Sequence, residues 1–278
     1  MNGCHLRIVL LSSALVAGAL SACTPVEEPP NSEIDIELPP THGKFDYQLG
    51  GAYLPPEGVT VVARDSTDEP VPNTYSICYV NGFQTQPDEA SIWIDSNEDL
   101  LLHEDTGEHV VDPDWPDEYI LNPTTESNRT RIVDIVGAVI DRCAEAGFDA
   151  VEIDNLDTWT RFTDVLDQDS SLALAAMYAE RAHQLGLAVA QKNAAEAAEE
   201  AKNEANFDFV VAESCIFYGE CGRYLNAYGP HVLDIEYSDT LDTPFSDVCR
   251  NPHRPPTVIL RDRNLEPDSA SGYVYETC

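Results

Sequence analysis

The sequence predicts an α/β fold, a TIM (β/α)8 barrel, because strand-like apolar runs alternate with helical patterns along the chain. Eight such runs are present, and eight parallel strands joined by right-handed crossovers close into a barrel. After residue 41 the chain has about 237 residues, which is enough for one large core and typical of a single barrel. An open, doubly wound sheet is the alternative architecture.

The strand candidates are short runs rich in β-branched and aromatic residues. In chain order they cover residues 45–49, 59–64, 75–80, 148–154, 188–192, 207–213, 232–237 and 257–261. Two helical patterns stand out between them. One stripe consists of Ile132, Ile135, Val136, Val139, Ile140 and Cys143 and is ended by Gly147, and the other pattern covers residues 171–185 and is ended by Gly186.

The N-terminal segment is predicted to consist of a signal peptide followed by a tether. Residues 1–22 contain Arg7 followed by an apolar run too short to span a bilayer, which is typical of a signal peptide. The string Leu20-Ser21-Ala22-Cys23 resembles a bacterial lipobox, which predicts lipidation of Cys23; an ordinary secretory signal is the alternative. Residues 23–41 are rich in Pro and Glu and read as a tether, which leaves residues 42–278 as the catalytic barrel. The expected location is extracellular, with a lipid anchor as the only membrane contact.

The charge balance limits the class of partner. The formal net charge is -35, so the field of the protein repels nucleic acid and anionic substrates. Cationic or neutral ligands remain, and a requirement for solubility or a salty habitat would also explain the charge. Since no GxGxxG or P-loop string follows a strand, no nucleotide or other cofactor is expected.

The cysteines predict disulfides. Six remain after the signal segment and Cys23, an even number in an exported chain. We expect pairs between Cys215 and Cys221, between Cys249 and Cys278, and between Cys78 and Cys143, although six cysteines allow 15 connectivities. A zinc site is the competing use, but without a CxxC pair or a His-x3-His spacing no metal is expected.

Two strand candidates end in a carboxylate, at Asp154 in FDAVEIDNLD and at Glu213 in FDFVVAE. A hydrolase with two carboxylates needs such a pair, because one group donates a proton while the other attacks or activates water. The alternative is that each acid caps a helix or pairs with an arginine. The ends of the predicted strands also bring polar and aromatic candidates for substrate contact: Gln48, Asp65, Tyr79, Asn155, Asp157, Lys192, Asn193, Tyr218, Glu236 and Tyr237. For Asp65 and Glu236 a salt bridge to Lys192 or Arg261 is equally plausible, and the tyrosines could stack on sugar faces.

Several ordered motifs together resemble glycoside hydrolase family 114, the endo-α-1,4-polygalactosaminidases. The resemblance implies a TIM barrel that cleaves α-1,4-linked galactosamine polymers such as those of microbial exopolysaccharide, with the acids of the fourth and sixth strands at Asp154 and Glu213. Two residues depart from the family pattern, since Ile153 replaces a proline and Ser214 replaces a second acid. The segments that carry the resemblance are FDYQLGGAY (45–53), ICYVNGFQTQP (77–87), GFDAVEIDNLD (147–157), AVAQKNAAE (188–196), FDFVVAESCIFYGEC (207–221) and IEY (235–237).

The expected mechanism is hydrolysis with retention. Asp154, kept ionised by Lys192 and Asn155, is the nucleophile, and Glu213, after an apolar run, holds its proton longer and acts as the acid. Substrate amines are expected to meet Asp65, Asp157 and Glu236. An inverting route, a non-catalytic sugar-binding lipoprotein, and a barrel hydrolase acting on a different polysaccharide remain as alternatives.

Overall fold

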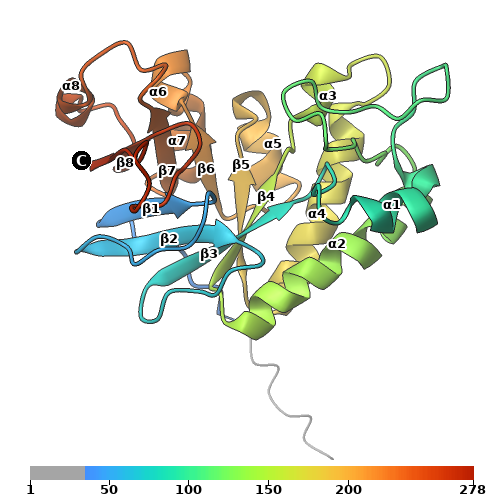
Figure 1. Ribbon diagram of the computed structural model, residues 1–278, viewed down its shortest axis with the longest axis horizontal. Coiled ribbons are helices and arrows are strands. Elements are labelled where there is room, and N and C mark those ends of the chain that lie inside the picture. The colour runs from blue at the N-terminus through green and yellow to red at the C-terminus, as the bar shows by residue number, and fades with distance from the viewer. Residues whose placement is uncertain (1–34) are drawn as a thin grey trace, which may run out of the picture. The chain divides into compact units, whose positions relative to one another are not determined.

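The computed structural model describes residues 35–278 (Figure 1). The predicted signal peptide, the lipidation site Cys23 and residues 23–34 of the predicted tether lie outside the described residues. None of the helices in the described part of the chain combines the length and apolar character needed to cross a bilayer.

Eight parallel strands follow one another around the sheet in chain order, as the sequence predicted. They are β1 (Lys44–Gln48), β2 (Val59–Asp65), β3 (Tyr75–Asn81), β4 (Ala150–Asp154), β5 (Ala188–Lys192), β6 (Phe209–Glu213), β7 (Val232–Tyr237) and β8 (Thr257–Arg261). β4 and β6 begin two residues later than predicted. Phe148 and Phe207 instead finish the preceding helices, since their amides donate to Cys143 and Ala201 near the helix ends.

A ninth strand, β9 (Tyr275–Thr277), was not predicted; it pairs antiparallel with β8. It lies at the seam of the barrel, where the Tyr275 hydroxyl donates to the Phe45 carbonyl of β1 at 2.9 Å and the Arg261 guanidinium donates to the Tyr47 carbonyl. The barrel therefore closes through β9 and side chains. Three residues are too short a run to show a strand period in sequence.

The helices are unevenly distributed around the barrel. Within the described chain, the connections after β1 and β2 contain no helix, so the regular strand-helix alternation begins only after β3. The two predicted helical patterns appear as the longest helices, α2 and α4. The helices are α1 (Ala90–Ser96), η1 (Glu98–Leu100), α2 (Glu126–Ala146), α3 (Thr158–Arg161), α4 (Gln168–Gln184), η2 (Ala195–Ala197), α5 (Ala198–Asn203), α6 (Cys215–Tyr218), α7 (Cys221–Tyr228) and α8 (Phe245–Arg250).

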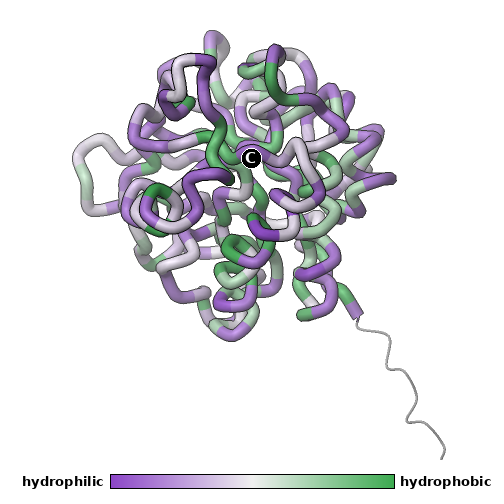
Figure 2. The backbone as a smooth tube through the Cα atoms, turned by 90° about the vertical axis from the view of Figure 1, so that its right-hand side faces the viewer, coloured by the Kyte–Doolittle hydropathy of each residue, from purple (hydrophilic) through white to green (hydrophobic). Residues whose placement is uncertain are grey.

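Alternate residues of each strand face two different cores. Small side chains such as Ala63, Ala150 and Ala190 fill the barrel interior between larger ones such as Phe45 and Phe209. The opposite faces of β3 to β6 pack against the helices in a second, larger core. Hydrophobic stretches lie mostly toward the middle of the molecule and hydrophilic stretches on the outer turns (Figure 2).

The packed part of the chain begins before the domain boundary expected at residue 42. Ile36 and Leu38 pack against the interior core, and the Tyr75 hydroxyl donates to the Glu37 carbonyl at 2.8 Å. These residues belong to the barrel and not to a free tether, because their apolar side chains gain burial there.

All three predicted disulfides are present. Cys78 of β3 is bonded to Cys143 of α2, Cys215 to Cys221 between α6 and α7, and Cys249 of α8 to Cys278. The last bond fixes the residue that follows β9, so it holds the seam of the barrel in place.

Candidate functional site

The candidate active site is built around one buried lysine at the carboxyl end of β5. The Lys192 Nζ atom lies 3.3 Å from Glu152 Oε1, 3.5 Å from Asp154 Oδ1 and 3.2 Å from Glu213 Oε2. The three acids come from β4 and β6, the strands on either side, and all face the barrel interior. We call Glu152, Asp154, Lys192 and Glu213 the lysine cluster.

The charges of the lysine cluster do not balance, since one cation faces three carboxyl groups. Burial alone would lower the pKa of Lys192, but Asp154 and Glu213 outweigh it and raise that pKa well above its ordinary value. Lys192 is therefore an ammonium. Burial raises the pKa of Glu152 to about 7, even though Lys192 opposes the rise, so the deepest acid is the one that carries a proton near neutral pH.

Asp154 and Glu213 have matching surroundings. Each accepts a hydrogen bond from a tyrosine hydroxyl, Tyr79 for Asp154 at 2.7 Å and Tyr237 for Glu213. Each also accepts an N–H, from the Asn155 backbone at 2.8 Å and from the Asn193 side chain at 3.0 Å. Each carboxylate is therefore held by one tyrosine hydroxyl and one N–H group.

The two acids are close enough to act on one bond. Because Asp154 Oδ1 and Glu213 Oε2 both contact Lys192 Nζ, they lie no farther apart than the sum of those two contacts, about 6.7 Å. Retaining glycosidases hold their carboxyl groups roughly 5 to 5.5 Å apart, and inverting ones roughly 6.5 to 9.5 Å. The geometry therefore fits a two-carboxylate site.

The apolar run that precedes Glu213 does not raise the pKa of this residue, contrary to the sequence-based expectation. Burial alone would raise its pKa, but Lys192 and the hydrogen bonds from Tyr237 and Asn193 lower it below the ordinary value. The apolar run before Glu213 faces the cores, whereas the carboxylate itself meets three donors. Local sequence did not reveal those donors, because they come from β5 and β7.

The backbone turns sharply after each of these strands. Asn155, Asn193, Ala194 and Ser214 all have positive φ, between 51° and 64°. Non-glycine residues in this region carry strain of order 1 kcal/mol or more, and such strain concentrates at functional sites. One of these turns connects the lysine cluster to a further acid. The Asn155 side chain donates to the Asn81 side chain at 3.0 Å, and Asn81 in turn donates to Glu118 at 3.0 Å.

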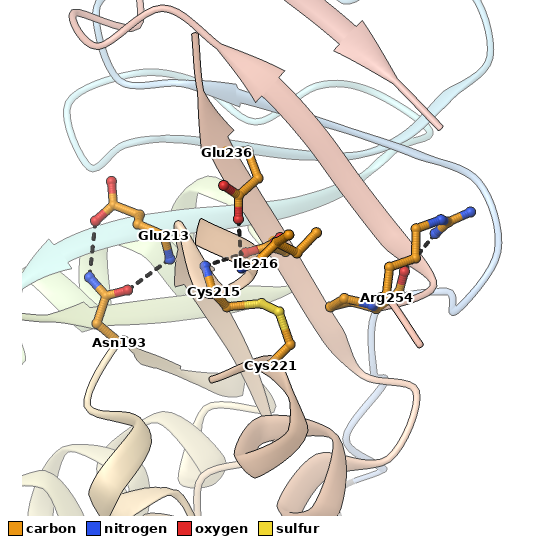
Figure 3. The surroundings of a disulfide bond; sticks show 9 residues. Asn193, Glu213, Cys215, Ile216, Cys221, Glu236 and Arg254 are labelled. Carbon is orange, nitrogen blue, oxygen red and sulfur yellow. Dashed lines mark hydrogen bonds between the residues drawn. A yellow bond between two sulfur atoms is a disulfide. The ribbon is translucent and has the colours of Figure 1, made fainter. Parts of the chain in front are cut away.

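Two predicted substrate contacts, Glu236 and Gln48, face away from the lysine cluster. Glu236 lies on the outer face of β7, is fully buried, and accepts the Ile216 amide at 2.8 Å, away from the Asn193–Glu213 pair (Figure 3). Gln48 is also fully buried, and its amide group is bound to Asp46 and Arg64. In both cases the alternation of side chains along a strand turns the residue away from the interior.

The other predicted acids are partly engaged. Asp65 caps a turn by accepting from the Thr67 amide at 2.9 Å, and it lines a cavity beside α1 that is separate from the lysine cluster. Asp157 forms an ion pair with Arg161 at 2.9 Å, and burial raises its pKa against the effect of that arginine. The salt bridges considered as an alternative for Asp65 and Glu236 are absent within residues 35–278, since neither acid pairs with Lys192 or Arg261.

Aromatic residues occupy two different places. Tyr79 and Tyr237 direct their hydroxyls at Asp154 and Glu213; the Tyr237 ring is buried and offers no open face to a sugar, whereas Tyr79 is half-buried. Tyr218 on α6 is 69% exposed, and Trp115, on the long connection after β3, is 65% exposed. These two rings project from the loops at the carboxyl edge of the strands.

Sequence reasoning overlooked Glu152, Glu118 and Trp115. Glu152 stands two residues before Asp154, so the strand period alone places it on the same inward face. Glu118 reaches the site from a connection of more than 40 residues, where no period guides a prediction. Burial raises the pKa of Glu118 to about 7, with Asp154 adding to the rise.

Comparison with known proteins gives the family. The family model for glycoside-hydrolase family GH114 matches residues 26–278. No curated protein shows significant similarity to the sequence. Among solved structures, Aspergillus fumigatus Ega3 in complex with galactosamine has a TM-score of 0.68 at 20% identity, over 88% of this chain and 98% of that one.

The glycoside hydrolase domain of PelA from Pseudomonas aeruginosa has a TM-score of 0.55 at 13% identity, over 82% of this chain and 98% of that one. At such identities the structural likeness supports the barrel fold. The family match covers most of the chain, including the lysine cluster. The chain therefore belongs to glycoside-hydrolase family GH114 and is a glycoside hydrolase.

Proposed function

We propose that this glycoside hydrolase cleaves α-1,4-linked galactosamine polymers with retention, using Asp154 and Glu213. The observation that carries the proposal is the contact of both carboxylates with one ammonium, which keeps them within about 6.7 Å of each other. A binding protein has no need for two acids held at this spacing. The roles of Asp154 as nucleophile and Glu213 as acid are themselves part of the proposal, because the matching surroundings of the two acids do not distinguish them.

In the first step an Asp154 oxygen attacks the anomeric carbon, and the bond from that carbon to the leaving oxygen breaks as Glu213 donates its proton to that oxygen. In the second step Glu213 takes a proton from water, and the water oxygen attacks the same carbon and releases Asp154. Tyr79 and Lys192 hold the attacking carboxylate in place throughout.

The lowered pKa of Glu213 has a consequence for this cycle. Glu213 must carry a proton before it can act as an acid, and Lys192, Tyr237 and Asn193 all favour its ionised form. The protonated fraction therefore falls as the pH rises through the acidic range. We expect an acidic pH optimum, with kcat/KM decreasing toward neutral pH.

The substrate class rests on charge and on the galactosamine complex of the similar Ega3 structure. A chain of net charge -35 attracts a polymer of protonated amines. Glu118, bound to Asn81 beside Asp154, is our candidate for an amine contact, and Asp65, Asp157, Asn155 and Asn193 remain candidates. The exposed faces of Trp115 and Tyr218 offer stacking surfaces for sugar rings farther from the cut.

The test is product sizing. Purified protein is incubated with deacetylated and with fully N-acetylated α-1,4-galactosamine polymer, and the products are separated by length. We expect short oligomers from the deacetylated polymer and little from the acetylated one, with D154A and E213A as blanks. Equal cleavage of both polymers would refute the amine preference, and no cleavage of either would refute the substrate class.

We further propose that the chain is exported and anchored to a membrane through lipid on Cys23. The lipobox-like string supports this, as do three disulfides, which persist in oxidising compartments. Replacing Cys23 with Ser should move the protein from the membrane fraction to the medium without changing its activity. An unchanged membrane fraction would contradict the anchor.

A further inference from the structure

A group of side chains that could bind a metal ion lies in the connection between β3 and α2, apart from the lysine cluster. After η1 the chain forms a hairpin in which His103 and His109 face each other in an antiparallel bridge. Glu98, at the start of η1, reaches the same point. Two imidazoles and one carboxylate are ligands typical of zinc sites.

The spacing of the ligand atoms fits a metal ion. Glu98 Oε1 lies 3.3 Å from His103 Nε2 and 3.6 Å from His109 Nε2, and all three atoms lie within 4.8 Å of one another. Ligands about 2.0 to 2.2 Å from a tetrahedral zinc ion are separated from each other by roughly 3.3 to 3.6 Å. Two of the three edges already have this length, and a small rotation of the imidazoles would set the third.

The histidines are also arranged as ligands. His103 Nδ1 lies 3.0 Å from the Leu101 carbonyl, an acceptor that favours the tautomer with the proton on Nδ1. That tautomer leaves the Nε2 lone pair directed at the cluster, and a carbonyl behind a ligating histidine is the usual support at metal sites. His109 Nε2 is buried and has no hydrogen-bond partner among residues 35–278, which is costly unless something else binds it.

We propose that Glu98, His103 and His109 bind one divalent transition-metal ion of the zinc class, with water at the fourth position. The sequence alone does not indicate this site, because it contains neither a CxxC pair nor a His-x3-His spacing, and His103 and His109 meet across a hairpin. Bound metal ties η1 to the hairpin and so stiffens the long connection that also carries Trp115 and Glu118. The alternative is a simple ion pair, in which protonated histidines bind Glu98.

Zinc binding by protein without a histidine tag decides between them. The protein is treated with EDTA, freed of chelator, and titrated with zinc chloride by calorimetry, with His253→Ala as control because His253 is exposed and outside the cluster. We expect one zinc ion per chain for the wild type and H253A. H103A and H109A should bind at least about tenfold more weakly.

A second readout guards against misfolded variants. Zinc should raise the melting temperature of the wild type and H253A but not of E98Q, H103A or H109A, and cobalt(II) should give the visible absorption bands of a tetrahedral site. The absence of saturable zinc binding by the wild type would overturn the proposal in favour of the ion pair. Unchanged affinity and stoichiometry in H103A and H109A would place the metal elsewhere and would also overturn it.

Discussion

Two groups of buried carboxylates lie at the ends of neighbouring strands, yet they differ in every property that matters for catalysis. The lysine cluster faces the barrel interior and contains a cation. The other group, Asp234 and Glu236 of β7, which we call the outer acid pair, faces outward beneath α6 and contacts no cation in the described chain. The alternation of side chains along β7 separates the two groups. Tyr237, which follows Glu236, faces the barrel interior, whereas Asp234 and Glu236 face outward.

The pKa values of the outer acid pair are raised, and no lysine or arginine of the described chain pairs with it. Burial raises the pKa of Asp234 well above its ordinary value, with Glu236 adding to the rise, and burial also raises the pKa of Glu236. Asp234 accepts the Cys215 backbone amide at 3.2 Å, and Glu236 accepts the Ile216 backbone amide at 2.8 Å; Figure 3 shows the Glu236 contact. They therefore hold the start of α6 in place. An acid at a strand end is therefore a candidate catalyst only when its side chain faces the barrel interior and a cation lies beside it.

The largest effect should come from the catalytic acids. D154A and E213A should each lower kcat on galactosamine polymer by on the order of 10² to 10⁴. E236Q, which keeps the shape of an outer acid, should stay within about twofold. Initial rates with all three variants provide the comparison. Azide should partly restore E213A on a substrate with a good leaving group, and comparable losses in E236Q would erase the distinction between the two groups.

The next effect concerns the cation. K192M leaves the carboxylates of the lysine cluster without their partner, which should lower the free energy of unfolding by about 3 to 5 kcal/mol at neutral pH. The loss should shrink in acid, where the carboxylates protonate. Denaturant unfolding at several pH values measures this, with the exposed Lys44→Met as control. A loss that does not depend on pH would mean that the lysine is needed only for packing.

The disulfide beside the outer acid pair comes third. Replacing Cys215 and Cys221 with Ser should lower the free energy of unfolding by only about 2 kcal/mol, because the closed loop is short. We expect kcat to fall markedly while the melting temperature changes little, since the loop closed by Cys215 and Cys221 follows Glu213 and must position it. Unchanged turnover together with a large drop in melting temperature would make the bridge purely structural.

The smallest effect is the titration of the outer acid pair itself. A carboxyl group whose folded pKa is raised contributes stability below its unfolded pKa, about 3.9 for aspartate, and loses it as the pH rises through the folded pKa. D234N removes this titration and keeps an oxygen for the Cys215 amide. Its melting temperature, relative to the wild type, should therefore increase from pH 4 to pH 8. A difference that is constant across this range would show that Asp234 titrates normally.

Much of the fold could be predicted from the sequence because each strand carries its own signal. All eight parallel strands and both long helices match local patterns, and three disulfides match spacing and parity. The seam did not follow, because β9 has only three residues and depends on pairing with β8. The connections after β1 and β2 contain no helix within the described chain, a departure from the strand-helix alternation that the local patterns do not indicate.

The site was harder to predict because its chemistry depends on contacts between strands. Asp154, Lys192 and Glu213 were identified from their positions at strand ends, and the structure brings them together. Glu152 belongs to the lysine cluster and Glu236 lies on the outer face of its strand, and a count of alternate residues along each strand gives both placements. The proton affinity of Glu213 could not be predicted, because its donors Asn193 and Tyr237 come from adjacent strands.

The central claim is that Asp154 of the lysine cluster is the nucleophile, and a trapped intermediate tests it most directly. E213Q should form the glycosyl-enzyme from a galactosaminide with a good leaving group but release it slowly, because no base activates water. Rapid acid quenching, proteolysis and mass spectrometry then locate the sugar. We expect the adduct on Asp154. An adduct on the outer acid pair or on any other peptide that lacks Asp154, or hydrolysis with inversion and no adduct, would contradict the account.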